Sequence, residues 1–194
     1  LMRVQKRNGE YEDVSFDKIL RRIQSLCIGD EFEKKLNIDP TIIAQKVCSE
    51  IYDNVKTSEL DELSSQTSIS MYSKNPDYGV LASRIVISNH HKRTDSSFKN
   101  IIQELFKNDI IQEYLYKVVQ ENSELIESKI NHIKDYELDY FGFKTLEKSY
   151  LLKINGIVVE RPQYLFMRVA LCIHRDNLEK AFETYNHISN KDFI

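Results

Sequence analysis

Apolar residues recur every three or four positions through most of this chain, and that spacing predicts amphipathic helices. The 194 residues include five glycines and three prolines, so few positions force a helix to end. We expect four helices between residues 16 and 92, and further helices within residues 98–133, from 162, and within 176–189. The chain should therefore be mainly helical with a small β component.

The β component is expected where two Asn-Gly pairs separate short runs of strand-forming residues. Asn-Gly favours a two-residue type I′ turn, because both central positions of that turn need positive φ. Each pair should therefore close a β-hairpin. The first pair, Asn8-Gly9, lies between residues 2–7 and 10–15, and the second, Asn155-Gly156, lies between 151–154 and 157–160.

Capping residues indicate where the first three helices begin. Ser15 can cap the first helix. Pro40 suits the first turn of a second helix, which we extend to Val55 because apolar residues repeat every four positions. The third helix should begin at Thr57-Ser58, with Ser58 and Asp61 as the two ends of a capping box.

A polar stretch at residues 94–97 predicts a boundary between two domains. Residues 1–95 should form a β-hairpin that covers a four-helix bundle. Residues 96–194 should form a second helical region that carries the second hairpin.

Composition and charge exclude several function classes. The net charge of −3 does not supply the basic excess of a nucleic-acid surface, and the apolar runs are too short to cross a bilayer. The amino-terminal residues lack the features of a secretory signal. Cys27, Cys48 and Cys172 lie in apolar helical patterns without metal-ligand spacing, so we expect buried, reduced thiols in a cytoplasmic protein.

Common catalytic and ligand motifs are missing from the sequence. It has no P-loop, no G-x-G-x-x-G and no H-E-x-x-H. His90 and His91 are adjacent on a predicted helix, so their side chains should diverge and share no metal. Nothing places Ser, His and Asp as a catalytic triad. We therefore assign neither a catalytic residue nor a metal ligand.

The first hairpin and the helix after it form the best candidate site. Lys6 and Arg7 end the first strand, and Lys18, Arg21 and Arg22 follow in the first turns of the helix. A helix amino terminus also favours anions, so these cations could surround a polyphosphate. Acidic residues near them, Glu12 and Asp17, could accept hydrogen bonds from a ribose or an adenine. The alternative is a solvated hairpin with ordinary surface charges.

The same stretch closely resembles the ATP-cone, a regulatory nucleotide-binding domain. The matching residues are Val4, Lys6-Arg7, Asn8-Gly9, Glu12, Val14 and Phe16-Asp17-Lys18-Ile19. Two further segments resemble the amino-terminal part of the large subunit of class I ribonucleoside-diphosphate reductases of eukaryotes and large DNA viruses. They are "NPDYGVLASRIVISNHHK" (75–92) and "YFGFKTLEKSYLLKINGIVVERPQYLFMRVALCIH" (140–174).

This resemblance implies a set of effector-binding residues. Lys6 and Arg7 match a phosphate-binding pair, residues 12–18 match the segment around base and ribose, and Lys92 matches another phosphate-binding lysine. Thr57 and Asp61 match further effector contacts, although the first could be only a helix cap and the second only a capping-box acid. The implied set is Lys6, Arg7, Glu12, Asp13, Val14, Ser15, Phe16, Asp17, Lys18, Thr57, Asp61 and Lys92.

The resemblance also implies ligands and partners. ATP or dATP would be the allosteric effector, with Mg²⁺ accompanying the nucleotide. The partners would be the radical-generating small subunit and further copies of the chain through the cone. Members of the family continue into a catalytic barrel that holds their reactive cysteines, so we expect this chain alone to be inactive. The alternative is a stand-alone, nucleotide-responsive assembly module without enzymatic activity.

Overall fold

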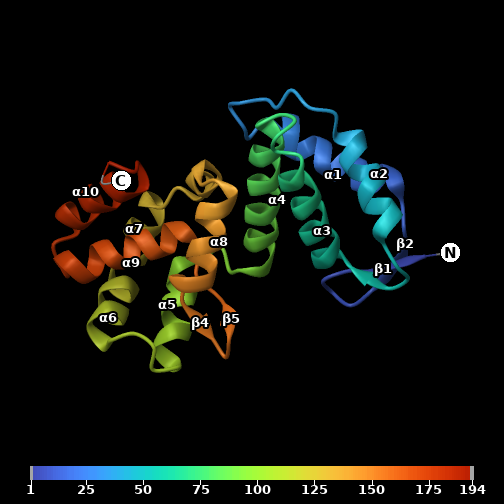
Figure 1. The fold of residues 1–194 in the computed structure, drawn as a ribbon. Helices are drawn as coiled ribbons and strands as arrows, with labels where there is room; N and C mark the ends of the chain where they lie inside the picture. The colour runs from blue at the N-terminus through green and yellow to red at the C-terminus, as the bar shows by residue number, and fades with distance from the viewer. Residues whose placement is uncertain (1, 193–194) are drawn as a thin grey trace. The chain divides into compact units, whose positions relative to one another are not determined.

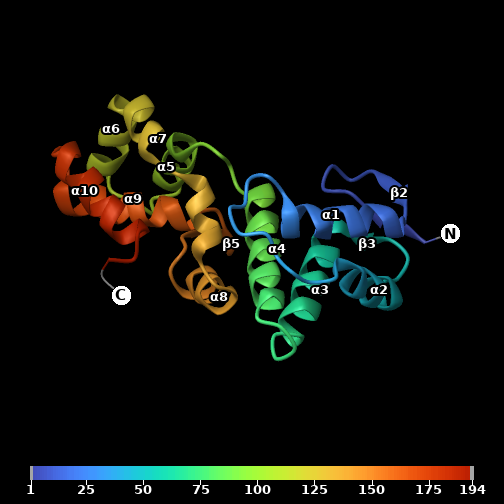
Figure 2. The ribbon, with the colours of Figure 1, turned by 90° about the horizontal axis from the view of Figure 1, so that it is seen from above.

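The computed structural model describes residues 2–192, and they are mainly helical with two small sheets (Figures 1 and 2). This confirms the predicted fold class. In chain order the elements are β1 (Arg3–Gln5), β2 (Tyr11–Asp13), α1 (Phe16–Ile28), α2 (Pro40–Glu50), β3 (Val55–Lys56), α3 (Thr57–Ser70), α4 (Asp77–Arg93), α5 (Phe98–Lys107), α6 (Glu113–Glu121), α7 (Ser123–Lys129), the 3₁₀ helix η1 (His132–Glu137), α8 (Tyr140–Ser149), β4 (Lys153–Ile154), β5 (Ile157–Val158), α9 (Pro162–His174) and α10 (Leu178–Ser189).

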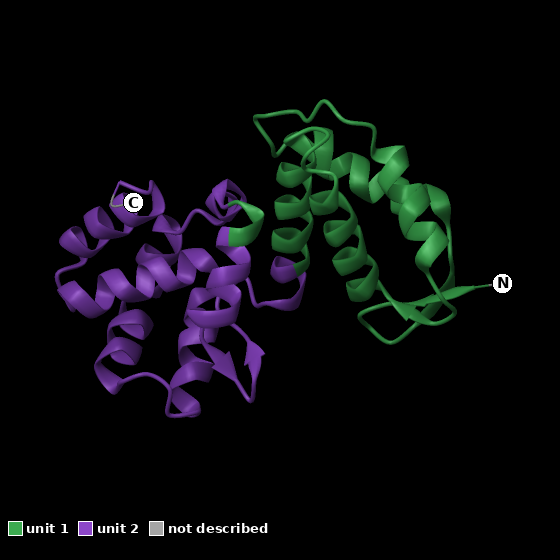
Figure 3. Ribbon diagram, in the orientation of Figure 1, with its two compact units in different colours: residues 1–89, 139–141 green, residues 90–138, 142–194 purple. Residues whose placement is uncertain are grey.

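The chain divides into two compact units (Figure 3). The first unit contains the residues up to Asn89 together with 139–141, and the second contains 90–138 and the residues from Gly142 onward. No helix among the described residues is long and apolar enough to cross a membrane.

The first unit carries a three-stranded sheet in the order β2-β1-β3, in which β1 and β3 run parallel. The sequence predicted only the β1–β2 hairpin and extended the second helix to Val55. That extension is wrong, because α2 ends at Glu50 and Val55 pairs with Val4 in the sheet. Both valines are buried, so packing between residues distant in sequence overrides the local helical spacing.

The two Asn-Gly pairs form different turns. Asn155 and Gly156 have φ of 50° and 78°, as a type I′ turn requires. In the first hairpin Gly9 has φ of 86°, and the backbone N–H of Lys6 donates to the carbonyl of Glu10 at 2.8 Å. This hairpin therefore has a three-residue loop with a left-handed glycine, and the predicted type I′ turn is wrong there.

The cap of helix α3 is shifted from the predicted position and involves one side chain only. Its first residue is Thr57, as expected. The Glu59 carboxylate, and not that of Asp61, accepts from the backbone N–H of Lys56 at 2.9 Å. The shift leaves the Asp61 side chain available for contacts outside its own helix. Ser15 caps α1 as predicted, accepting from the Lys18 backbone N–H at 3.4 Å.

Each unit has its own apolar core. In the first unit, α1, α2, α3 and α4 bury side chains such as Ile23, Ile43, Val47 and Leu81. In the second, helices α5, α6, α7, α9 and α10 contribute a cluster that includes Phe98, Ile102, Leu105, Val119, Ile126, Tyr164, Met167 and Tyr185.

The three cysteines differ in exposure. Cys27 is buried, and burial raises the pKa of its thiol to about 11. Cys48 is half-buried. The expectation of a buried thiol is wrong for Cys172, which is exposed because α9 turns Ala170 and Leu171 toward the core and the next two residues outward.

The second unit also buries an ion pair that ties its hairpin region to α9. The Glu160 carboxylate is fully buried and accepts from Arg168 Nε at 2.7 Å and Nη2 at 3.0 Å. It also accepts from the backbone N–H of Leu152 at 3.2 Å. These bonds compensate for the cost of removing the carboxylate from water.

We predict that Glu160→Gln lowers the free energy of unfolding of the second unit by about 3 kcal/mol, because it leaves the Arg168 charge largely buried without its counterion. The control is Glu113→Gln, which removes an ion pair with Lys117 in which both side chains are exposed. This substitution should cost under about 0.5 kcal/mol. Urea unfolding followed by circular dichroism measures both. Equal effects in the two variants would refute the prediction.

Candidate functional site

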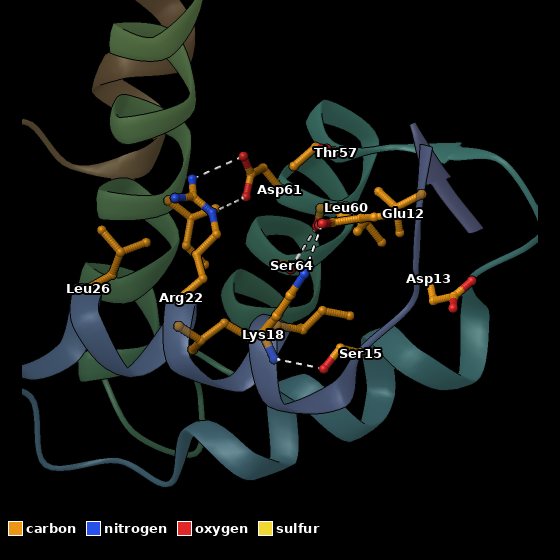
Figure 4. Close-up of a pocket in the computed structure, with 14 residues that line it drawn as sticks. Glu12, Asp13, Ser15, Lys18, Arg22, Leu26, Thr57, Leu60, Asp61 and Ser64 are labelled. Atoms are coloured by element: carbon orange, nitrogen blue, oxygen red, sulfur yellow. Dashed lines mark hydrogen bonds and ion pairs between the residues drawn. The ribbon is translucent and has the colours of Figure 1, made fainter. Parts of the chain in front are cut away.

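A cavity of about 200 Å³ opens in the first unit between β2, α1 and α3 (Figure 4). One part of its wall is apolar and the rest carries charged and polar side chains. The apolar part comprises Val4, Ile19, Ile23, Leu26, Leu60 and Ile85, and the polar part comprises Glu12, Asp13, Ser15, Lys18, Arg22, Thr57, Asp61 and Ser64.

Glu12 joins two of the predicted phosphate-binding lysines at the rim. Its Oε2 lies 2.9 Å from Lys6 Nζ and 2.8 Å from Lys18 Nζ. Lys18 is on the first turn of α1 and Lys6 is beside the hairpin loop, so the carboxylate holds the two elements together. The hydrogen bonds from Lys18 and Lys6 lower the pKa of Glu12, and the bond to Glu12 raises the pKa of Lys6.

Asp61 joins two arginines on the other side of the cavity. Its carboxylate accepts from Arg22 Nε at 2.6 Å and Arg22 Nη2 at 3.0 Å, which is a bidentate pair (Figure 4). It also accepts from Arg7 Nη2 at 3.2 Å. The Asp61 side chain is 5% exposed, whereas those of Arg7 and Arg22 are 30% and 25% exposed. The arginines therefore remain within reach of a ligand.

Thr57 and Asp61 do not have the purely local roles, helix cap and capping-box acid, that the sequence left open as alternatives. Thr57 Oγ1 donates to the carbonyl of Gln5 at 3.1 Å, so the hydroxyl ties α3 to β1 and does not cap its own helix. Asp61 binds arginines, and Glu59 instead accepts from the backbone N–H at the start of the helix. Both side chains line the cavity.

The structure brings together most of the residues that the sequence assigned to the site. Glu12, Asp13, Ser15, Lys18, Thr57 and Asp61 line the cavity. Lys6 and Arg7 are bonded to lining residues. Val14, Phe16 and Asp17 belong to the same segment but do not line the cavity. Lys92 lies in the last turn of α4, in the part of that helix that belongs to the second unit.

The sequence-based site omitted residues that the tertiary structure adds. Arg22 was one of several candidate cations, and only the structure places it on Asp61. Its spacing of four from Lys18 puts both on one face of α1, which is a signal that the sequence does contain. Leu60 and Ile85 of the apolar wall, and Asn89, which accepts from Arg7 Nη2 at 2.5 Å, come from segments too distant in sequence to be found by spacing.

The charges of the site fit a polyphosphate. Lys6, Arg7, Lys18 and Arg22 surround two carboxylates, those of Glu12 and Asp61. Asp13 also lines the cavity, so four cations face three carboxylates, which leaves a local charge of +1 although the chain is acidic overall. Its apolar wall can accept a planar base. Among residues 2–192 no group of three or more His, Cys, Asp or Glu side chains is arranged to hold a metal ion.

A hairpin on a four-helix unit, with such a cavity between the hairpin, α1, α3 and α4, defines a class of regulatory nucleotide-binding domain. The family model described as "ATP cone domain" matches residues 2–93. A second model, "Ribonucleotide reductase, all-alpha domain", matches residues 136–194. The chain belongs to the ribonucleotide reductase large-subunit family, of which it carries the ATP cone and all-alpha sequence.

Relatives from distant organisms support this assignment. Over 99% of its length the chain is 45% identical to a ribonucleoside-diphosphate reductase large subunit of Dictyostelium discoideum, 43% identical to one of Arabidopsis thaliana and 44% identical to one of Monkeypox virus. The matched regions are 23%, 24% and 26% of those proteins. The chain therefore spans about a quarter of the length of the curated relatives that it matches.

We predict that the Glu12 carboxyl titrates below the ordinary glutamate pKa and that Lys18→Gln raises its pKa, because the hydrogen bond from Lys18 is the largest cause of the shift. Since the folded-state pKa is lowered, the pairing stabilises the hairpin above the unfolded-state pKa and is lost as the pH falls through the folded-state value. Carbon-13 NMR of the glutamate carboxyls measures this titration. Lys46→Gln, at an exposed position on α2, is the control and should leave Glu12 unchanged.

Proposed function

We propose that the chain is an allosteric sensor that binds ATP or dATP in the cavity of its first unit. The observation that carries this proposal is an apolar-walled cavity that Lys18 and Arg22 line, and whose carboxylates, Glu12 and Asp61, also bind Lys6 and Arg7. Membership of a family whose domain is described as an ATP cone agrees with a nucleotide of this kind. Mg²⁺ would accompany the bound triphosphate.

The nucleotide would exchange one set of ionic contacts for another. In the structure the four cations are paired with Glu12 and Asp61. A triphosphate carries more charge than these two carboxylates, so it can take up N–H donors of Lys6, Arg7 and Lys18 in charge-assisted hydrogen bonds. Glu12 would then be free to accept from the ribose hydroxyls or the adenine amino group, while Asp61 would stay paired with Arg22.

The remaining residues of the proposed site follow the resemblance to the family. Asp13, Val14, Ser15, Phe16 and Asp17 form the segment that would lie along the base and ribose. Thr57 and Asp61 would contact the sugar from α3. Lys92 would add a phosphate contact from the end of α4.

The activity of the parent protein is a further part of the proposal. The relatives are named as reductases of ribonucleoside diphosphates, and we propose that this chain regulates such a reductase in the cytoplasm, with a radical-generating small subunit as partner. The chain alone would reduce nothing. ATP and dATP would differ in effect only as far as their affinities for two assembly states differ, so the cone would control homo-oligomer formation.

We predict that the chain binds ATP and dATP, because the cation cluster matches a triphosphate, and that the two ligands produce different distributions of oligomers. Isothermal titration calorimetry measures binding, and native mass spectrometry or light scattering measures mass. Absence of heat and of any mass change with both nucleotides would overturn the proposed function. Deoxynucleotide formation by this chain with a small subunit and a reductant would overturn the expectation that it is inactive alone.

We predict that Lys6→Ala weakens ATP binding by roughly tenfold or more, since one charge-assisted hydrogen bond to phosphate contributes about 1.5–3 kcal/mol. The matched control is Lys46→Ala, which removes the same charge from an exposed position on α2 and should change the affinity little. An unchanged affinity in Lys6→Ala, measured under conditions where the wild type binds, would remove this lysine from the site.

A further inference from the structure

Arg7 forms the hydrogen bond of the proposed site that joins the residues most distant in sequence. Its Nη2 donates to Asp61 Oδ2 on α3 at 3.2 Å and to Asn89 Oδ1 on α4 at 2.5 Å. Both hydrogens of Nη2 therefore have partners. The three other N–H donors of the guanidinium, one on Nε and two on Nη1, have no hydrogen-bond partner among residues 2–192.

The two acceptors are held more firmly than the arginine. Asn89 and Asp61 are 5% and 4% exposed as whole residues, and each lies on a helix of the four-helix unit. Arg7 lies in the three-residue loop of the hairpin, and its side chain is 30% exposed. Two buried acceptors thus fix a guanidinium that its own loop would leave mobile.

The two acceptors are not equivalent, because Asp61 is shared. Its Oδ1 and Oδ2 already accept from Arg22 in the bidentate pair, so its bond to Arg7 is the longer one. Asn89 accepts from Arg7 at the shorter distance. A neutral amide can orient an arginine without neutralising it, whereas a second carboxylate would compete with phosphate for the positive charge.

We infer that Asn89 is a positioning residue for nucleotide binding. It holds Nη2 of Arg7 so that the remaining N–H donors are oriented for the phosphates of the ligand before the ligand arrives. This inference rests on the proposed function. Its energetic basis is that ordering a long side chain in advance removes part of the entropy that binding would otherwise cost. Asn89 itself does not touch the ligand and acts through Arg7.

The position of Asn89 gives this contact a second consequence. Asn89 lies four residues before the end of α4 at Arg93, and α4 continues from the first unit into the second. The hydrogen bond from Arg7 to Asn89 therefore links the hairpin loop to the helix that continues beyond the first unit.

The test is a double-mutant cycle measured by ATP calorimetry on the full chain. Asn89→Ala should weaken ATP binding roughly three- to tenfold, because Arg7 must then be ordered by the ligand. In an Arg7→Ala background the same substitution should have little further effect, because its route to the ligand is gone. Ser88→Ala, at the preceding position of α4, is the matched control and should bind like the wild type.

A readout without nucleotide tests the positioning step itself. Nitrogen-15 NMR of the Arg7 guanidinium should show hindered rotation in the wild type and averaged Nη signals in Asn89→Ala. If the alanine variant does not fold, Asn89→Leu retains the approximate shape of the side chain while removing the acceptor, and the same results are expected from it.

The outcomes separate the two proposals. Failure of the wild type to bind ATP overturns the proposed function and this inference together. If the wild type binds ATP, equal or tighter binding by Asn89→Ala overturns the inference alone. An undiminished effect of Asn89→Ala in the Arg7→Ala background also overturns it, because Asn89 would then act by another route.

Discussion

The arrangement of the first unit depends on the pairing of the buried Asp61 carboxylate with Arg22 and Arg7. A single ionised group removed from water is costly unless it is paired and its lone pairs are used. Here Arg22 takes both oxygens in a bidentate pair and Arg7 takes one of them again. The compensation requires α1, α3 and the hairpin loop to meet at one point. The same requirement shapes the wall of the cavity.

The local structure at the start of α3 makes that meeting possible. Glu59 satisfies the backbone N–H of Lys56, and Thr57 donates to the carbonyl of Gln5 on β1. The first turn of the helix is thus satisfied by residues other than Asp61 and is anchored to the sheet. The parallel pairing of Val55 with Val4 holds β3 and the start of α3 beside the hairpin.

The site also explains how an acidic chain can present an anion-binding surface. Net charge acts over long distances and is screened by salt, whereas hydrogen-bonded pairs act within a few ångströms. Glu12 and Asp61 each hold two cations, so the cluster stays assembled without a ligand and keeps a positive excess. A site of this kind gains affinity by exchanging partners, because its cations are already gathered in one place. The ion pair of the second unit has a structural role, since Glu160 and Arg168 tie the hairpin region to α9.

Local patterns in the sequence determined the mainly helical fold, the two hairpins, the cap at Ser15 and the set of basic residues beside the first hairpin, because helical spacing, turn chemistry and capping act within a few residues. Tertiary structure decided what depends on distant partners. It ended α2 at Glu50 and placed Val55 in a sheet, widened the first turn, and exposed Cys172. It also selected Arg22 and Asn89 as partners of the Asp61 and Arg7 side chains. The cost of burying the Asp61 carboxylate decides its pairing with Arg22, and the proximity of α4 to the hairpin loop decides the pairing of Asn89 with Arg7. Both conditions exist only once separate segments have packed together.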